Sequence, residues 1–137
     1  MRDYVFDANA VLRFRRAEPG GEKVKSLIEQ AIAGQAHLAM SVINLGEVYY
    51  NVLRGEGELS AQRAITAIHE VLAEIVEVDE AQALEAGALK VRYKLGYADA
   101  FAALTAMRMN ATLVSADPAF QRLGRKLKLL RLPRHAS

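Results

Sequence analysis

The sequence contains no cysteine, and this absence removes several kinds of site at once. Without thiols the chain forms no disulfide bond, binds no zinc through thiolates and has no cysteine nucleophile. The three histidines, His37, His69 and His135, lie far apart in the sequence, without the spacing typical of metal ligands. We interpret them as ordinary surface or core residues.

Long apolar runs are absent as well. No run approaches the roughly 18 residues that a membrane helix needs. The start of the chain, Met1-Arg2-Asp3, leads into only three apolar residues, which is fewer than the apolar region of a signal peptide contains. We therefore expect no membrane segment and a cytoplasmic protein.

The composition is that of one globular domain. Hydrophobic residues make up 52% of the 137 residues and charged residues 25%, which is typical of a chain that folds around its own core. No internal repeat, low-complexity stretch or domain linker interrupts the sequence. We expect a single domain over residues 1–137, with residues 133–137 as a frayed tail.

Acidic residues are missing from the last part of the chain. Residues 1–117 hold 12 basic and 16 acidic residues, a net charge of −4, whereas residues 118–137 hold six basic residues and no acid. The six are Arg122, Arg125, Lys126, Lys128, Arg131 and Arg134. A basic end of this kind can follow a phosphate backbone, and a solvated surface is the alternative.

What is present is a regular alternation of short apolar segments and helical patterns. Strands are predicted at residues 4–6, 37–40, 74–78 and 112–114, with a last edge strand within 127–132. Helices are predicted after Asp7 and at residues 22–33, 42–53, 60–72, 80–94 and 98–109, with a further helix starting at Asp117-Pro118. Ser41 and Ser60 are expected N-caps, and Asp79 with Gln82 has the spacing of a capping box. The pattern predicts an α/β sandwich with a mostly parallel sheet.

Four acidic residues stand apart from the surface charge. Asp7 follows the first strand and Asp117 the fourth, Asp99 opens an alanine-rich helix, and Glu47 lies inside an apolar helix. Helix capping can account for Asp7, Asp99 and Asp117, since all three lie at helix starts, but it cannot account for Glu47. A cluster of oxygen ligands around Mg²⁺ or Mn²⁺ accounts for all four, because a cation offsets the repulsion and desolvation of grouped carboxylates.

Four short motifs carry a family resemblance. They are YVFDANAVL, SVINLGEVYY, YADAFAALTA and TLVSADPAF, and in this order they resemble a PIN domain, more narrowly the single-domain ribonuclease toxins of the VapC type. The resemblance implies an α/β/α sandwich with a central, mostly parallel sheet of four to five strands and the first strand in the middle. It matches Asp7, Glu47, Asp99 and Asp117 to the acidic quartet of the family. Asn9 and Ser115 match the polar residues that hold those carboxylates in place.

The resemblance also implies a function. It indicates an Mg²⁺-dependent endoribonuclease, with Mn²⁺ as a substitute, that hydrolyses RNA through a metal-bound water as the toxin of a type II toxin–antitoxin system. Asp7 and Asp99 are the expected direct ligands, Asp117 binds directly or through water, and Glu47 binds a second ion or orients the attacking water. Expected partners are RNA, a cognate antitoxin and a second copy of the chain. Residues expected to bind RNA are Arg122, Arg125, Lys126 and Lys128.

Other functional classes remain open from the sequence. A module of the same fold could bind RNA or protein with weak or no catalysis. A haloacid-dehalogenase-like phosphatase needs a second aspartate two residues after the first, where this chain has Asn9, and also a catalytic lysine that we do not find. A receiver domain needs a threonine and a lysine after its acids, whereas Thr112 precedes Asp117.

Overall fold

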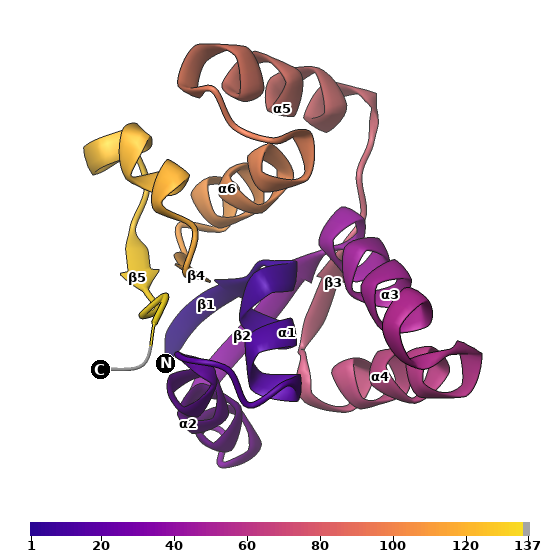
Figure 1. Cartoon of the computed structure of the whole chain (residues 1–137). Coiled ribbons are helices and arrows are strands. Elements are labelled where there is room, and N and C mark those ends of the chain that lie inside the picture. The colour runs from indigo at the N-terminus through magenta and orange to yellow at the C-terminus, as the bar shows by residue number, and fades with distance from the viewer. Residues whose placement is uncertain (136–137) are drawn as a thin grey trace.

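A five-stranded parallel sheet forms the centre of the molecule (Figure 1). The computed structural model describes residues 1–135. The strands are β1 (Arg2–Phe6), β2 (Ala36–Ser41), β3 (Glu74–Val76), β4 (Thr112–Ser115) and β5 (Leu129–Arg131). Their order is β3-β2-β1-β4-β5, and all four neighbouring pairs are parallel. The mostly parallel sheet with the first strand in the middle is thus confirmed.

Helices cover both faces of this sheet. They are α1 (Ala8–Arg15), α2 (Gly21–Ile32), α3 (Val42–Glu56), α4 (Glu58–Val71), α5 (Glu80–Tyr93), α6 (Tyr97–Met109) and the 3₁₀ helix η1 (Pro118–Lys126). Successive residues of β1 point to opposite faces, so Tyr4 and Phe6 pack with α1 to α4 while Val5 packs with α5, α6 and η1. Two apolar cores result, one on each side of the sheet, as an α/β/α sandwich requires.

The predicted elements are all present, and the differences lie at their ends. The sequence predicted that α3 would end before Gly55 and that Ser60 would cap the next helix. Instead α3 continues to Glu56 and α4 begins at Glu58, with Gly57 alone between them at φ 96°. Glycine adopts this conformation at little steric cost, so one residue ends one helix and starts the next. The prediction for Ser60 was therefore wrong.

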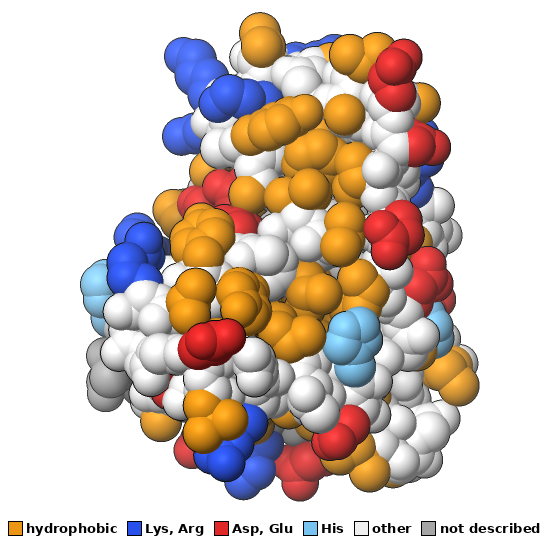
Figure 2. Space-filling view, turned by 90° about the vertical axis from the view of Figure 1, so that its right-hand side faces the viewer, with side chains coloured by type: hydrophobic (Ala, Val, Ile, Leu, Met, Phe, Trp, Pro, Cys, Tyr) orange, Lys and Arg blue, Asp and Glu red, His pale blue; other side chains and the backbone are white. Residues whose placement is uncertain are grey.

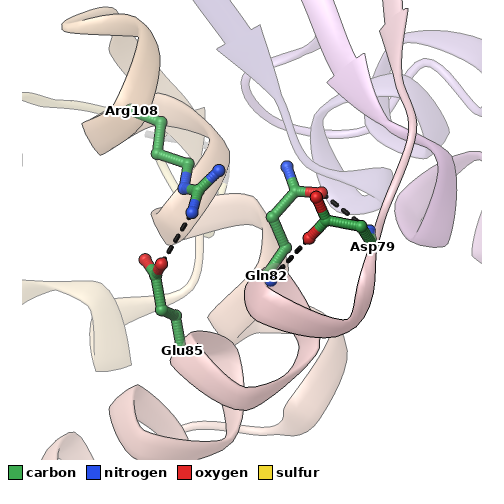
Figure 3. Close-up of polar contacts among 4 residues, drawn as sticks. All are labelled: Asp79, Gln82, Glu85 and Arg108. Atoms are coloured by element: carbon green, nitrogen blue, oxygen red, sulfur yellow. Dashed lines mark hydrogen bonds and ion pairs between the residues drawn. The ribbon is translucent and has the colours of Figure 1, made fainter.

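Helix α5 and helix α6 form a pair on the second face. The predicted capping box is present: Gln82 N–H donates to Asp79 Oδ1 and Asp79 N–H donates to Gln82 Oε1, both at 2.8 Å (Figure 3). An ion pair of 2.6 Å between Arg108 and Glu85 joins the two helices. Four alanines of α6, Ala100, Ala102, Ala103 and Ala106, are fully buried, which lets this helix lie close against the sheet while α5 covers it from outside.

The end of the described chain folds back over the first helix. Leu132 is 4% exposed and its N–H donates to Ser115 O at 2.9 Å. The Arg13 guanidinium donates to Pro133 O at 3.0 Å and to Arg134 O at 3.5 Å. We name residues 132–134 the C-terminal strap. The sequence predicted a frayed tail over residues 133–137, but Pro133 and Arg134 are attached to α1, and residues 136–137 lie outside the described part.

Among residues 1–135, no helix is long and apolar enough to cross a membrane.

Candidate active site

The site lies where the direction of the sheet connections changes. The crossovers from β1 and β2 run over one face and those from β3 and β4 over the other, so β1 and β4 are neighbours at the switch point. Asp7 follows the end of β1, and Asp117 follows the end of β4 after one residue, Ala116. Because Phe6 pairs with Val114, both acids reach the same edge of the sheet.

A cavity of about 360 Å³ opens at this edge, and all four predicted acids line it. Asp7 and Asp117 come from the strand ends, Glu47 from α3 and Asp99 from the first turn of α6. We call this the acid cavity. Four residues spread from position 7 to position 117 therefore line one cavity.

Asp7 is both a helix cap and a buried acid. Its side chain is 3% exposed, and Oδ1 accepts a hydrogen bond of 2.8 Å from Ala10 N–H in the first turn of α1. Burial raises the pKa of Asp7 to about 7; hydrogen bonds from Ser115 and Ala10 oppose this shift only in part. The negative charges of Asp99 and Glu47 also contribute to the raised pKa.

Asp99 does not cap its helix. Helix α6 begins at Tyr97, Gly96 occupies the N-cap position, and no side chain caps this end of the helix. The carboxylate of Asp99 folds back so that a side chain at Gly96 would meet Oδ2 at 3.3 Å. The pKa of Asp99 is raised to about 7. Burial is the largest cause, and the negative charge of Asp117 and a hydrogen bond shared with it come next. Capping therefore explains Asp7 and Asp117, but neither Asp99 nor Glu47.

The two predicted polar neighbours hold the loops that carry the acids. Asp117 caps η1 by accepting from Ala119 N–H at 2.9 Å, and its own N–H donates to Ser115 Oγ at 3.0 Å. Asn9 Oδ1 accepts from Ala116 N–H at 3.2 Å and so ties the start of α1 to the loop after β4. Both residues thus lie beside the acids, and their part in any reaction stays a prediction.

Sequence reasoning missed one residue of the site, Asn44. Its side chain is fully buried in α3, and Nδ2 donates to Glu47 Oε1 at 2.8 Å and to Ala98 O at 3.1 Å. This amide therefore fixes the carboxylate of Glu47 and connects α3 to the start of α6 next to Asp99. Its Oδ1 is buried without a hydrogen-bond partner within residues 1–135. The signal in the sequence was a polar residue one helical turn before Glu47 in an apolar helix.

The acids of the cavity form no ion pair within residues 1–135, although Arg13 and Arg134 also line the cavity. The described residues form three ion pairs, and none of these involves Asp7, Glu47, Asp99 or Asp117. A set of carboxylate oxygens without sulfur or imidazole suits a hard cation such as Mg²⁺ or Mn²⁺. Within residues 1–135 no three acidic or histidine side chains stand close enough to hold an ion as they are placed. The chemistry of these donors fits a divalent ion, and its binding stays a prediction.

The predicted RNA-binding residues lie away from the acid cavity. Neither Arg122, Arg125, Lys126 nor Lys128 lines it. Arg122 donates to the carbonyl oxygens of Tyr93 and Lys94 at the end of α5, and Lys126 lies over the Tyr93 ring at 5.7 Å. Lys128 precedes β5 at the opposite end of the sheet. Their binding to RNA stays a prediction, and the basic residue that does line the cavity from the C-terminal end is Arg134.

The fold and the site together define a class: an α/β/α sandwich with grouped carboxylates at the switch point of a parallel sheet. A family model for the PIN domain matches residues 4–126, and the chain belongs to this family. This membership leaves the dehalogenase-like and receiver alternatives without support. Comparison with curated proteins gives no match.

Solved structures with the same fold extend the comparison. VapBC2 of Rickettsia felis, bound to a DNA fragment from its promoter, has a TM-score of 0.74 at 20% identity over 95% of this chain and 98% of that chain. VapBC-1 of nontypeable Haemophilus influenzae has a TM-score of 0.70 at 21% identity, over 94% and 97%. VapC20 of Mycobacterium tuberculosis, a toxin that cleaves the sarcin–ricin loop, has a TM-score of 0.70 at 19% identity, over 88% and 95%.

Proposed function

We propose that this protein is a metal-dependent endoribonuclease and the toxin of a type II toxin–antitoxin pair. The observation that carries the proposal is the acid cavity, in which four carboxylates from four elements meet and none forms an ion pair with a basic side chain among residues 1–135. Structural capping does not require Asp99 or Glu47 at this place, whereas a divalent ion does. The fold shared with VapC20, which cleaves RNA in the sarcin–ricin loop, supports RNA as the substrate.

The residues divide the work according to their positions. When bound, Mg²⁺ supplies a water of lowered pKa and stabilises negative charge on the phosphate oxygens. Asp7 and Asp99 hold the ion directly in this proposal, and Asp117 holds it directly or through water. Glu47 binds a second ion or orients the attacking water. Asn44 donates to one carboxylate oxygen of Glu47, and the other accepts no hydrogen bond from residues 1–135.

The products follow from the absence of imidazole at the site. Neither His37, His69 nor His135 lines the acid cavity, so no histidine pair is placed to activate the RNA 2′-hydroxyl. We expect attack by water, which leaves a 5′-phosphate and a 3′-hydroxyl. Recovery of 2′,3′-cyclic phosphate ends would contradict this chemistry.

The experiment compares Asp99→Asn with Asp79→Asn. Asparagine and aspartate are near-equal N-caps, so the control at the cap of α5 should cleave RNA like wild type. Asp99→Asn removes a ligand charge and should lower cleavage by about two orders of magnitude or more. Without metal it should melt at the same temperature as wild type or higher, because it relieves repulsion among carboxylates, and it should gain less stability from Mg²⁺. Equal cleavage and equal Mg²⁺ shifts for both variants would contradict the proposal.

The toxin proposal includes an antitoxin partner. Neighbours of this fold were solved as toxin–antitoxin complexes from Haemophilus influenzae and Klebsiella pneumoniae. An apolar groove of about 430 Å³ lies between α1, α2 and α4 and offers a surface for such a partner; Val11, Phe14, Ile28 and Ile68 are among its lining residues. The antitoxin encoded by a neighbouring gene should inhibit RNA cleavage, and Phe14→Glu should weaken its binding in a calorimetric titration. Unchanged binding would move the interface elsewhere.

A homodimer is the second partner that we propose. Large apolar side chains are exposed on α3 and α5, among them Leu53 at 38%, Leu84 at 68% and Val91 at 80%. Figure 2 shows apolar side chains gathered along the side of the molecule where α3 and α4 lie, with charged side chains at its margins. Leu53→Glu and Leu84→Glu should shift the protein toward monomer in sedimentation velocity, while Ile32→Glu on α2 should not. A wild type that sediments as a monomer at high concentration would contradict the dimer.

A further inference from the structure

We propose that the C-terminal strap carries Arg134 to the rim of the acid cavity, where its guanidinium binds a backbone phosphate of the RNA. Arg134 lines the cavity together with the four acids, although it lies far from all of them in the sequence. This inference rests on the ribonuclease function proposed above and names a substrate-binding residue of the same site.

The strap is fixed to the body of the protein at two points before Arg134. The side chain of Leu132 is buried in the core beneath α1, and its N–H donates to the carbonyl oxygen of Ser115, next to the loop that carries Asp117. Gly20 permits this close approach: at φ 90° a Cβ there would lie 2.9 Å from Leu132 Cβ and 3.4 Å from Pro133 Cδ. The strap therefore packs closely against the turn between α1 and α2.

Arg13 is the third attachment, and it acts on the strap backbone. Its Nη1 donates to Pro19 O at 2.7 Å and to Pro133 O at 3.0 Å, which joins the α1–α2 turn to the strap. Arg13 also lines the cavity, but its guanidinium already donates to these backbone carbonyls. Arg134 differs, because its side chain is exposed and forms no hydrogen bond or ion pair with any residue from 1 to 135.

The guanidinium of Arg134 forms no ion pair with the acids, which leaves its charge for a phosphate of the substrate. No carboxylate of the cavity lies within ion-pairing distance of it, so the acids stay available for a cation. RNA is a polyanion that must approach four carboxylates, and a cation at the rim offsets this repulsion. A guanidinium matches phosphate geometry with two parallel N–H donors, which a lysine does not provide.

The experiment compares Arg134→Gln with Arg63→Gln, an exposed arginine on α4 that does not line the cavity. Cleavage kinetics in Mg²⁺ should show KM raised by about tenfold for Arg134→Gln, the loss expected for one charged phosphate contact. Binding of a labelled single-stranded RNA to each variant in an Asp99→Asn background should lose about 0.7 from the slope of log affinity against log salt. Arg134→Lys should restore the slope but only part of the affinity, and Arg63→Gln should match its parent.

A second variant tests the strap itself. Gly20→Val keeps Arg134 but collides with Leu132, so it should produce the same loss of salt slope; a melting curve establishes that the protein is folded. Salt slopes of Arg134→Gln and Arg63→Gln that agree would overturn the inference. So would faster cleavage by Arg134→Gln at limiting Mg²⁺, which would make Arg134 a counter-ion of the acids.

Different results would contradict the ribonuclease function and the role of Arg134. A wild type that binds RNA but cleaves none with Mg²⁺ contradicts the ribonuclease function, while the salt slopes still decide on Arg134. A wild type that binds no RNA contradicts both.

Discussion

At the scale of single residues, one buried amide decides where Glu47 points. Asn44 is the only link by side-chain hydrogen bonds between Glu47 and the start of α6 among the described residues. A carboxylate in a helix has several rotamers, and each one places its oxygens differently relative to the other acids. Fixing one rotamer by a charge-assisted hydrogen bond preorganises the site before any ligand arrives.

Asn44→Ala should therefore reduce catalysis more than it reduces folding. It removes a buried side-chain donor from both Ala98 O and Glu47 Oε1, which should cost about 1–3 kcal/mol of unfolding free energy. With Glu47 released, kcat should fall by about tenfold or more while KM changes little, because the RNA contacts remain. Steady-state kinetics well below the melting temperature, beside urea denaturation, separate the two effects.

Thr105→Ala is the matched control. Thr105 is buried in α6 and donates to Phe101 O at 2.8 Å, but it does not line the acid cavity. It should lose stability without losing kcat. If Asn44→Ala loses stability but keeps kcat, the amide only supports the fold.

The residues also show how far sequence reasoning reaches. Asp7 and Asp117 were predictable because apolar runs mark the strand ends, and parallel strands bring those ends to one edge. Glu47 was found because a lone charge in an apolar helix needs a partner. Asn44 was missed because its second partner, Ala98 O, is 54 positions away and no spacing rule connects them.

At the scale of elements, the basic segment from Arg122 to Lys128 contacts other parts of the protein. Arg122 donates to two carbonyl oxygens at the C-terminal end of α5, where free carbonyls need donors. Arg125 forms no hydrogen bond or ion pair within residues 1–135, and Lys126 lies on an aromatic ring. Lys128 donates to Asn110 O at 3.4 Å, so Arg125 and Lys126 are the two basic residues of this segment that donate to no backbone carbonyl within residues 1–135.

Neutralising both, as Arg125→Gln with Lys126→Gln, should weaken RNA binding. The slope of log affinity against log salt should flatten by about one to two units, because two counterion-releasing contacts are removed. The measurement is a salt titration with a labelled RNA, again in the Asp99→Asn background. Affinity that is unchanged across the titration would make the segment a solvated surface.

Element ends were less predictable than element types. Apolar runs identified all five strands, but the third strand ends at Val76 instead of residue 78, and the last covers only Leu129–Arg131. Both are edge strands, whose length depends on a single neighbour and not on their own sequence. The junction at Gly57 likewise depends on how α3 and α4 pack against each other, which propensity alone does not contain.

At the scale of the whole molecule, the buried acids make stability depend on pH. In the metal-free protein the pKa values of Asp7 and Asp99 are about 7, against an ordinary value of 3.8. Below about pH 4 both the folded and the unfolded chain carry these protons. Between about 4 and 7 the unfolded chain releases them while the folded chain keeps them, so their contribution to stability declines as pH rises.

The metal-free melting temperature should therefore fall from about pH 5 to pH 7 and then level, apart from the contributions of other groups. Asp99→Asn lacks one of the two carboxylates and should show a smaller fall, which isolates the effect. Saturating Mg²⁺ should reverse the trend, because the ion binds ionised carboxylates and gains affinity as they lose protons. Differential scanning calorimetry with EDTA and with Mg²⁺ provides the comparison. Identical pH profiles for wild type and Asp99→Asn would contradict the assignment.

The position of β1 in the middle of the sheet has a consequence for the newly made chain. One edge of β1 pairs with β2, which follows soon after it, but its other edge pairs with β4, at residues 112–114. During synthesis this second edge stays unpaired until most of the chain has been made. Until then Asp7, which follows β1, lacks Asp99 and Asp117 as neighbours. The ribonuclease proposed above would endanger its own production by cleaving RNA while still attached to a ribosome. Here the order of the strands keeps the acidic centre incomplete until β4 and Asp117 have been made.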